Sequence, residues 1–229
     1  MALTPAAPQL QTFLESLREV YQLMEMHSVL AGSGPGRKHH VEVLNKSAIV
    51  LVVACWEAYV EDLVKSTLEV LIKTAKNHTS FPKTVLERVG SKNSGINAWN
   101  LAGDGWRAAL NDNLSEVLAK TTGTLNTPKT AQVDELFLKA LGHPQLSGCW
   151  SWSGRTAIES SKALDDLVSL RGAIAHRVKH SRPVRKSDVQ NAIELVSRLA
   201  AKSNNEVRKF VHQLSGQHPW SSITYKGTK

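Results

Sequence analysis

The chain has 229 residues, of which 41% are hydrophobic and only 6% aromatic, so it can bury a sizeable and mostly aliphatic core. Its formal net charge of +8 lies in the last third, because residues 155–229 hold 14 basic and 6 acidic side chains whereas residues 1–154 hold 14 of each. The two cysteines, without paired spacing, argue against a disulfide framework, and the longest apolar run, Ala48–Trp56, is about half the ~20 residues of a bilayer span.

The first half of the chain predicts two long helices. Residues Gln9–Ala31 place apolar side chains at helical spacing, and a glycine-rich break follows at 32–36. From His39 to about Lys76 the pattern is densely apolar, without Gly or Pro, and between Ala48 and Val60 it is apolar nearly all round. We therefore expect a central buried helix there. The β-branched run at 49–53, taken alone, also fits a buried strand, but its polar flanks and the length of the segment favour helix.

The second half predicts a variable region followed by three more helices. Residues 81–127 are richer in Gly, Asn, Ser and Thr and should hold short helices. Ser187 is the expected N-cap of the last helix, with Asp188 in its first turn. The predicted helices are Lys83–Val89, Trp106–Lys120, Thr130–Leu141 after Pro128, Ser153–Ala175 and Ser187–Leu214.

These elements together predict an all-α protein, a helical bundle around a long central apolar helix. We expect one domain over residues 9–214, elaborated at about 77–127, and a polar tail at 215–229 with Trp220 as its anchor. The N-terminus carries no basic lead and no hydrophobic signal region, which favours a cytoplasmic protein without a membrane partner.

A basic motif, Arg171-Gly172-Ala173-Ile174-Ala175-His176, lies in the region of excess charge. Arginine binds phosphate oxygens through its planar fork of donors, and histidine moves protons near neutral pH. The pair therefore suits an RNA phosphodiester. Further basic residues, expected to hold the flanking RNA backbone, follow the motif: Arg177, Lys179, His180, Arg182, Arg185 and Lys186.

Helix geometry complicates this interpretation, because residues five apart on a straight helix point about 140° from each other. Either the helix ends or bends near His176, or a second copy of the chain completes the site. A structural alternative pairs Arg171 near a helix end with Asp165, Asp166 or Asp188 and leaves His176 without a catalytic role. A zinc pair of His176 and His180 is disfavoured by the surrounding cations and by the lack of a nearby Glu, so no metal and no cofactor are expected.

Two segments together resemble a HEPN domain (higher eukaryotes and prokaryotes nucleotide-binding) of the RiboL-PSP-HEPN group. The first, Ala54–Leu63, is similar to the aromatic-acidic helix signature of that group. The second, Leu170–His176, matches the HEPN motif of Arg, four to six residues and then His. Three shorter segments between them support the resemblance and follow in the expected order: Leu125–Pro128, Leu141-Gly142 and Trp150–Trp152. The resemblance extends from about Gln9 to Trp220.

The resemblance implies a helical bundle that forms a homodimer, with the motif helices of two chains meeting in one cleft. It also implies a metal-independent endoribonuclease in which Arg171 and His176 are catalytic, often in a toxin or phage-defence setting with an antitoxin or another defence protein as partner. Glu57 and Asp62, on the signature helix, are then candidates for orienting His176 or Arg171, or else serve solubility or a core ion pair. Trp56 and Tyr59 are expected to pack in the core.

One departure from the family pattern concerns the residue after the arginine. Active HEPN members usually carry a polar residue there, often Asn or Asp, whereas this chain has Gly172. Two alternative functions therefore stay open: a non-catalytic RNA-binding or dimerisation module, and an interaction protein whose basic face binds an acidic partner.

Overall fold

The structure, a computed structural model, describes residues 6–31, 41–125, 127–177 and 183–225. In chain order its helices are α1 (Pro8–Ala31), α2 (Glu42–Thr74), η1 (His78–Ser80), α3 (Lys83–Lys92), η2 (Gly95–Leu101), α4 (Gly105–Asp112), α5 (Leu114–Thr121), η3 (Thr122–Thr124), α6 (Thr130–Leu141), η4 (Leu146–Cys149), α7 (Ala157–Arg177) and α8 (Lys186–Ser215). Within the described ranges the β-type pairing is limited to an isolated bridge between Trp152 and Arg155, and the all-α prediction is confirmed.

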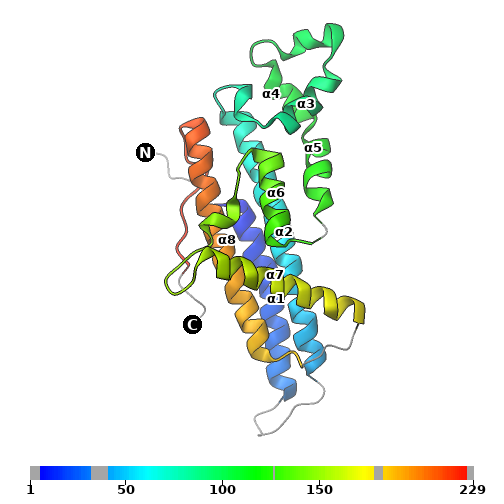
Figure 1. Ribbon diagram of the computed structural model, residues 1–229, viewed down its shortest axis with the longest axis vertical. Helices are drawn as coiled ribbons and strands as arrows, with labels where there is room; N and C mark the ends of the chain where they lie inside the picture. The colour runs from blue at the N-terminus through cyan, green and yellow to red at the C-terminus, as the bar shows by residue number, and fades with distance from the viewer. Residues whose placement is uncertain (1–5, 32–40, 126, 178–182, 226–229) are drawn as a thin grey trace.

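Helix α2 is the spine of the fold. It has 33 residues, about 50 Å at 1.5 Å per residue, and α1, α6, α7 and α8 all pack against it (Figure 1). Ile49 and Val52 lie in this helix and are completely buried, so the segment at 49–53 is helix and not strand. Among the helices in the described ranges, none combines the length and apolarity that a membrane span requires.

A cluster of aromatic side chains fixes α2 against its neighbours. Trp56 and Tyr59 are at most 1% exposed, which confirms that they pack in the core, and the rings of Trp56 and Trp150 meet edge to face at 5.8 Å. Two hydrogen bonds hold α8 and the segment before α6 to the spine: Trp56 Nε1 donates to Pro128 O at 3.1 Å and Tyr59 Oη donates to Ala200 O at 2.8 Å. Trp150 Nε1 donates to Ser203 Oγ at 2.8 Å and so joins the end of η4 to α8.

The helices α3, α4 and α5 form an elaboration at the C-terminal end of α2 (Figure 1). Arg107 attaches it, because its guanidinium donates at 2.7 Å to the carbonyl oxygens of both Ile72 and Ala75. These oxygens belong to the end of α2, where carbonyls lack a partner within the helix and where positive charge is favoured.

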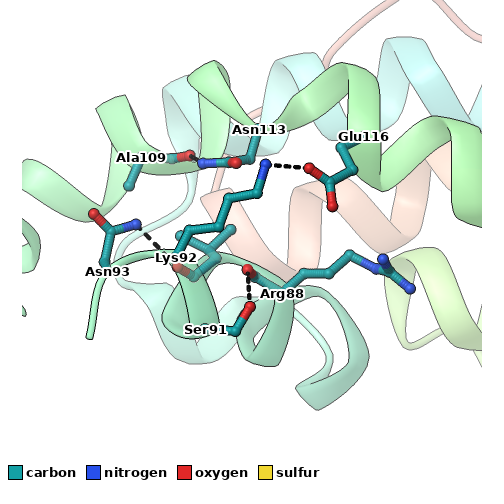
Figure 2. A network of polar contacts seen from close by, with 8 residues as sticks. Arg88, Ser91, Lys92, Asn93, Ala109, Asn113 and Glu116 are labelled. Carbon is teal, nitrogen blue, oxygen red and sulfur yellow. Dashed lines mark hydrogen bonds and ion pairs between the residues drawn. The ribbon is translucent and has the colours of Figure 1, made fainter.

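Polar contacts tie the elaboration together internally. Figure 2 shows the ion pair between Lys92 of α3 and Glu116 of α5, with Asn93 and Asn113 nearby. Both asparagines donate their side-chain amide to the carbonyl four residues earlier, Asn113 to Ala109 O at 2.7 Å. Because such a side chain competes for the backbone, the predicted helix Trp106–Lys120 divides at Asn113 into α4 and α5.

Two predicted helix starts were wrong. The N-cap of α8 is Arg185 and not Ser187, because the Asp188 carboxylate accepts a hydrogen bond from the Arg185 backbone N–H at 2.8 Å. Helix α7 begins at Ala157 and not at Ser153, because the chain first turns back between Trp152 and Arg155. Gly154, with a φ of 81°, makes this tight turn possible.

The predicted anchor of the C-terminal segment is confirmed. Trp220 is 1% exposed, and its indole N–H donates to Asn204 O at 3.3 Å. In return, Arg208 Nε donates to Trp220 O at 2.7 Å, so residues 216–225 are held along α8.

Candidate active site on helix α7

Helix α7 carries both residues of the basic motif. Its start is defined by reciprocal hydrogen bonds, from Thr156 N to Glu159 Oε2 at 2.7 Å and from Glu159 N to Thr156 Oγ1 at 3.2 Å. Leu164 and Val168 form its buried face. The helix continues without interruption through the motif to Arg177, beyond the predicted end at Ala175, so the geometry of a straight helix applies to the whole motif.

Arg171 faces α2 and forms an ion pair with Glu57. Its Nη2 donates to Glu57 Oε2 at 3.0 Å, and the two side chains are 24% and 25% exposed. The alternative pairing of Arg171 with one of three aspartates is not found, because each of them contacts another group. Asp165 accepts a hydrogen bond from Thr130 N, Asp166 from Lys162 Nζ, and Asp188 from Arg185 N. The guanidinium is therefore held at the junction of α2 and α7 by a half-buried carboxylate.

His176 lies on a different side of α7 from Arg171. It is exposed and lies five positions after Arg171 in the helix, which corresponds to a rotation of about 140°. In Figure 1 the C-terminal end of α7 extends past the other helices of the bundle. One chain therefore does not direct both side chains at the same phosphate.

Gly172 faces open space. A Cβ atom built on this glycine would meet nothing within 4 Å outside its own helix. No steric constraint of the fold therefore requires glycine here, and Asn or Asp would fit. Its lack of a side chain leaves the surface of α7 flat between Arg171 and His176.

Three acidic residues cluster on α2 around the ion pair. Burial raises the pKa of Glu57, while Arg171 lowers it. Burial also raises the pKa of Glu61, and the carboxylates of Glu57 and Asp62 raise it further. Asp62 has a pKa raised by burial and lowered by Lys65, and no hydrogen bond or ion pair within the described ranges joins it to Arg171. Of the two predicted supporting residues, Glu57 contacts the motif and Asp62 does not.

We expect Glu61→Gln to stabilise the protein at pH 7. Because the folded pKa of Glu61 lies above its unfolded value, the charged carboxylate costs stability once the pH rises through the folded pKa, and it costs nothing below the unfolded pKa. Thermal unfolding should show a higher Tm than wild type at pH 7 and no difference near pH 4. Glu15→Gln, on the exposed face of α1, is the control, and an equal gain in both variants would contradict the explanation.

The basic residues after the motif are only partly within the described ranges. Arg185 and Lys186 are exposed at the start of α8, and Lys186 Nζ donates to Ser28 Oγ of α1 at 2.8 Å. Lys179, His180 and Arg182 lie outside the described residues, as does the side chain of Arg177. Within the described ranges, no group of three or more His, Cys, Asp or Glu side chains is arranged to hold a metal ion.

An apolar groove between α2 and α7, which Ile174 lines about one helical turn after Arg171, was missed by the sequence analysis. Its volume is about 410 Å³, and we name it the α2–α7 groove after its lining residues: Val43, Lys46, Ser47, Val50, Leu51 and Ile174. Val43 is 63% and Leu51 37% exposed. The expectation that the helix is buried nearly all round between Ala48 and Val60 was therefore wrong at Leu51. The signal was present, since an all-round apolar helix leaves an apolar face wherever one chain does not cover it.

Comparison with known proteins identifies the family. A family model described as RiboL-PSP-HEPN matches residues 15–209, which is most of the chain. No curated protein and no solved structure gave a significant match. HEPN domains are all-α and often act as endoribonucleases, bind RNA and form dimers. The matched span includes α2 with Glu57, and α7 with Arg171 and His176, so the chain belongs to the RiboL-PSP-HEPN family.

Proposed function

We propose that the protein is a homodimeric, metal-independent endoribonuclease whose catalytic residues are Arg171 and His176. The observation that carries the proposal is the ion pair with Glu57, which holds Arg171 partly exposed, while His176 is exposed near the end of the same helix. A guanidinium fixed by a carboxylate is oriented for phosphate, and an exposed imidazole is free to exchange protons.

Arg171 and His176 point about 140° apart around α7, and this supports a site shared by two chains. In a twofold dimer, Arg171 of one copy can lie close to His176 of the other. The α2–α7 groove adjoins the motif through Ile174, and its exposed apolar wall, with Val43 and Leu51, is the kind of surface that a second copy would cover. Covering this face would also exclude water from the ion pair.

The chemistry follows from the two side chains. His176 takes the proton of a ribose 2′-OH, and the 2′-oxygen attacks the adjacent phosphorus as the bond from phosphorus to the 5′-oxygen breaks. A protonated His176 from the second copy gives a proton to the leaving 5′-oxygen. Arg171 stabilises the negative charge that develops on the non-bridging oxygens. The products are a 2′,3′-cyclic phosphate and a 5′-OH end.

The biological setting proposed is that of a toxin or phage-defence effector in the cytoplasm, restrained by an antitoxin or another defence protein. The basic residues after the motif would hold the flanking RNA, and Arg185 and Lys186 are exposed as this role requires. Their contribution should make RNA binding sensitive to salt.

A second candidate is a non-catalytic RNA-binding or dimerisation module. Gly172 favours it, because the polar side chain usual at this position in active members is missing although the surrounding space would accept one. A protein that binds an acidic partner through its basic face is the third alternative.

One assay separates these functions. Purified protein is incubated with labelled single-stranded RNA and with tRNA in EDTA, the fragment ends are identified by mass spectrometry, and the mass in solution is measured. Cleavage to 2′,3′-cyclic phosphate ends by a dimer is the expected result. Binding without cleavage would favour the module, cleavage that depends on added Zn²⁺ would contradict the mechanism, and a strictly monomeric active protein would contradict the shared site.

A further inference from the structure

A second groove, on the side of α7 that faces α8, has no role in the mechanism above. Its volume is about 780 Å³, and Leu170 of α7, Asn191 of α8 and Trp152 of the preceding turn are in its wall. A cavity of about 330 Å³ adjoins it, because Trp152 and Arg198 line both. We name the two together the Trp152 groove.

One end of the Trp152 groove is aromatic and basic. Trp152 is half-buried, and the guanidinium carbons of Arg155 and Arg198 lie 5.6 and 5.4 Å from the centre of its ring. Arg198 also lies 4.9 Å from the ring of Tyr225, and Lys202 is in the wall of the smaller cavity. Both guanidiniums lie over the Trp152 ring, and an aromatic ring layered with guanidinium planes is a combination that stacks nucleobases and binds their phosphates.

Charge is separated along the α8 wall of the groove. Asp188 lies toward the start of the helix, whereas Arg198 and Lys202 follow toward its end. Asp188 and Arg198 are ten residues apart, about 15 Å along the helix. Glu194 accepts hydrogen bonds from Arg198 Nε and Nη2 at 2.9 and 2.8 Å, which fixes the guanidinium in the wall. Glu194 offsets part of the charge of Arg198, and Arg155 and Lys202 add positive charge at the Trp152 end, which favours phosphate there.

A flat surface leads from the groove to the motif. Ser169 lines the groove, and His176 lies seven residues further on the same side of α7, two helical turns or about 10 Å away. Gly172 and Ala173 occupy the positions between them. Since a side chain at Gly172 would point into open space, its absence leaves room for a backbone to pass close to the helix. The distance corresponds to about three nucleotides at the spacing of a stacked strand.

We propose that the Trp152 groove binds a nucleotide unit of the single-stranded RNA that is cleaved at His176, with a base stacked on Trp152 and its phosphates held by Arg155, Arg198 and Lys202. The inference rests on the proposed function for the identity of the strand. In this arrangement the groove recognises a nucleotide a few positions away from the cleaved bond. The missing side chain at Gly172 lets the RNA strand run close to α7 between the groove and His176. The same chemistry would suit a free nucleotide, and the experiment includes that ligand.

The test measures binding by full-length His176→Ala protein, so that cleavage does not interfere. The probes are a fluorescent A12 RNA and AMP. Adding Trp152→Ala should weaken RNA binding about 5- to 150-fold, the range for loss of one stacked base, whereas Trp152→Phe should retain most of the affinity. Trp99→Ala is the matched control, because Trp99 is 80% exposed in η2 of the elaboration, and it should bind as the parent does.

A second variant keeps the inference falsifiable if Trp152→Ala fails to fold. Lys202→Gln should reduce the salt dependence of RNA affinity by about 0.7 in the slope of log K against log [salt], the value for one lost phosphate contact on a single strand. Unchanged affinity in a folded Trp152→Ala, or an unchanged slope in Lys202→Gln, would overturn the inference. AMP binding that depends on Trp152, without an effect on RNA, would also overturn it and would indicate a site for free nucleotide.

The failures of the two proposals are distinguishable. If protein with His176 intact cleaves RNA and Trp152→Ala leaves the KM for A12 unchanged, the groove is not a subsite and the proposed function stands. If RNA binds through Trp152 but is not cleaved, the groove is a subsite of a non-catalytic RNA-binding protein and the proposed function fails.

Discussion

Replacing His176 by alanine is expected to lower the rate of RNA cleavage by about 10²- to 10⁴-fold, because a positioned proton-transfer group contributes that share of catalysis. His176 is exposed near the end of α7, so the change removes no core packing and the fold should be retained. The measurements are the single-turnover rate on labelled RNA and the Tm of both proteins.

The matched control for this prediction is His218→Ala. His218 is also exposed, but it lies in the C-terminal segment with its ring stacked on that of His212 at 4.1 Å. Its removal should leave the cleavage rate within about twofold of wild type, as for a surface change away from a site. An unchanged rate in folded His176→Ala would sink the proposed mechanism, whatever the effect of His218→Ala.

The fold could largely be predicted from hydrophobic periodicity, but the helix ends could not. The long apolar patterns correctly predicted α1, α2, α6 and α8, because burial of an apolar face dominates where a helix forms. The ends depend on single polar contacts with similar energies. Ser187 and Asp188 both favour a helix start, and only the hydrogen bond from Arg185 N to Asp188 decides between them.

The sequence indicated which residues belong to the candidate site, but it did not predict which of them contact each other. Arg171 and Glu57 are 114 positions apart, and no local pattern places one beside the other. The family resemblance indicated both residues, and the fold brings them together because α7 packs against α2. The Trp152 groove depends on contacts among α7, α8 and the C-terminal segment, which periodicity does not specify.

Arg171→Ala is expected to reduce cleavage by about 10²- to 10³-fold, the usual cost of removing a group that stabilises charge in the transition state. RNA binding should weaken much less, because Arg185, Lys186 and the other basic residues still attract the strand. The loss should therefore appear in kcat more than in KM, and a loss confined to KM would identify Arg171 as a binding residue instead.

The role of Glu57 can be separated from that of Arg171. Glu57→Ala removes the carboxylate that holds the guanidinium, so kcat should fall although no catalytic group is lost. Glu57→Gln keeps an oxygen that accepts from Arg171 Nη2, and it should recover part of the rate. Equal losses in both variants would show that the charge of Glu57 matters and that its hydrogen bond does not.

Mixing two inactive variants tests the shared site directly. Arg171→Ala keeps His176, and His176→Ala keeps Arg171. If the two residues act within one chain, every mixed dimer lacks one of them and the mixture stays inactive. If they act across the twofold axis, half of the randomly formed dimers are mixed, and each mixed dimer retains one Arg171 paired with one His176 but lacks the second His176 that protonates the leaving oxygen. The 140° between the side chains on one straight α7 disfavours the first arrangement for a single phosphate, so we expect the mixture to cleave RNA faster than either variant alone but more slowly than wild type. A mixture as inactive as its components, although the dimers exchange subunits, would contradict the shared site and leave the geometry of α7 without a catalytic interpretation.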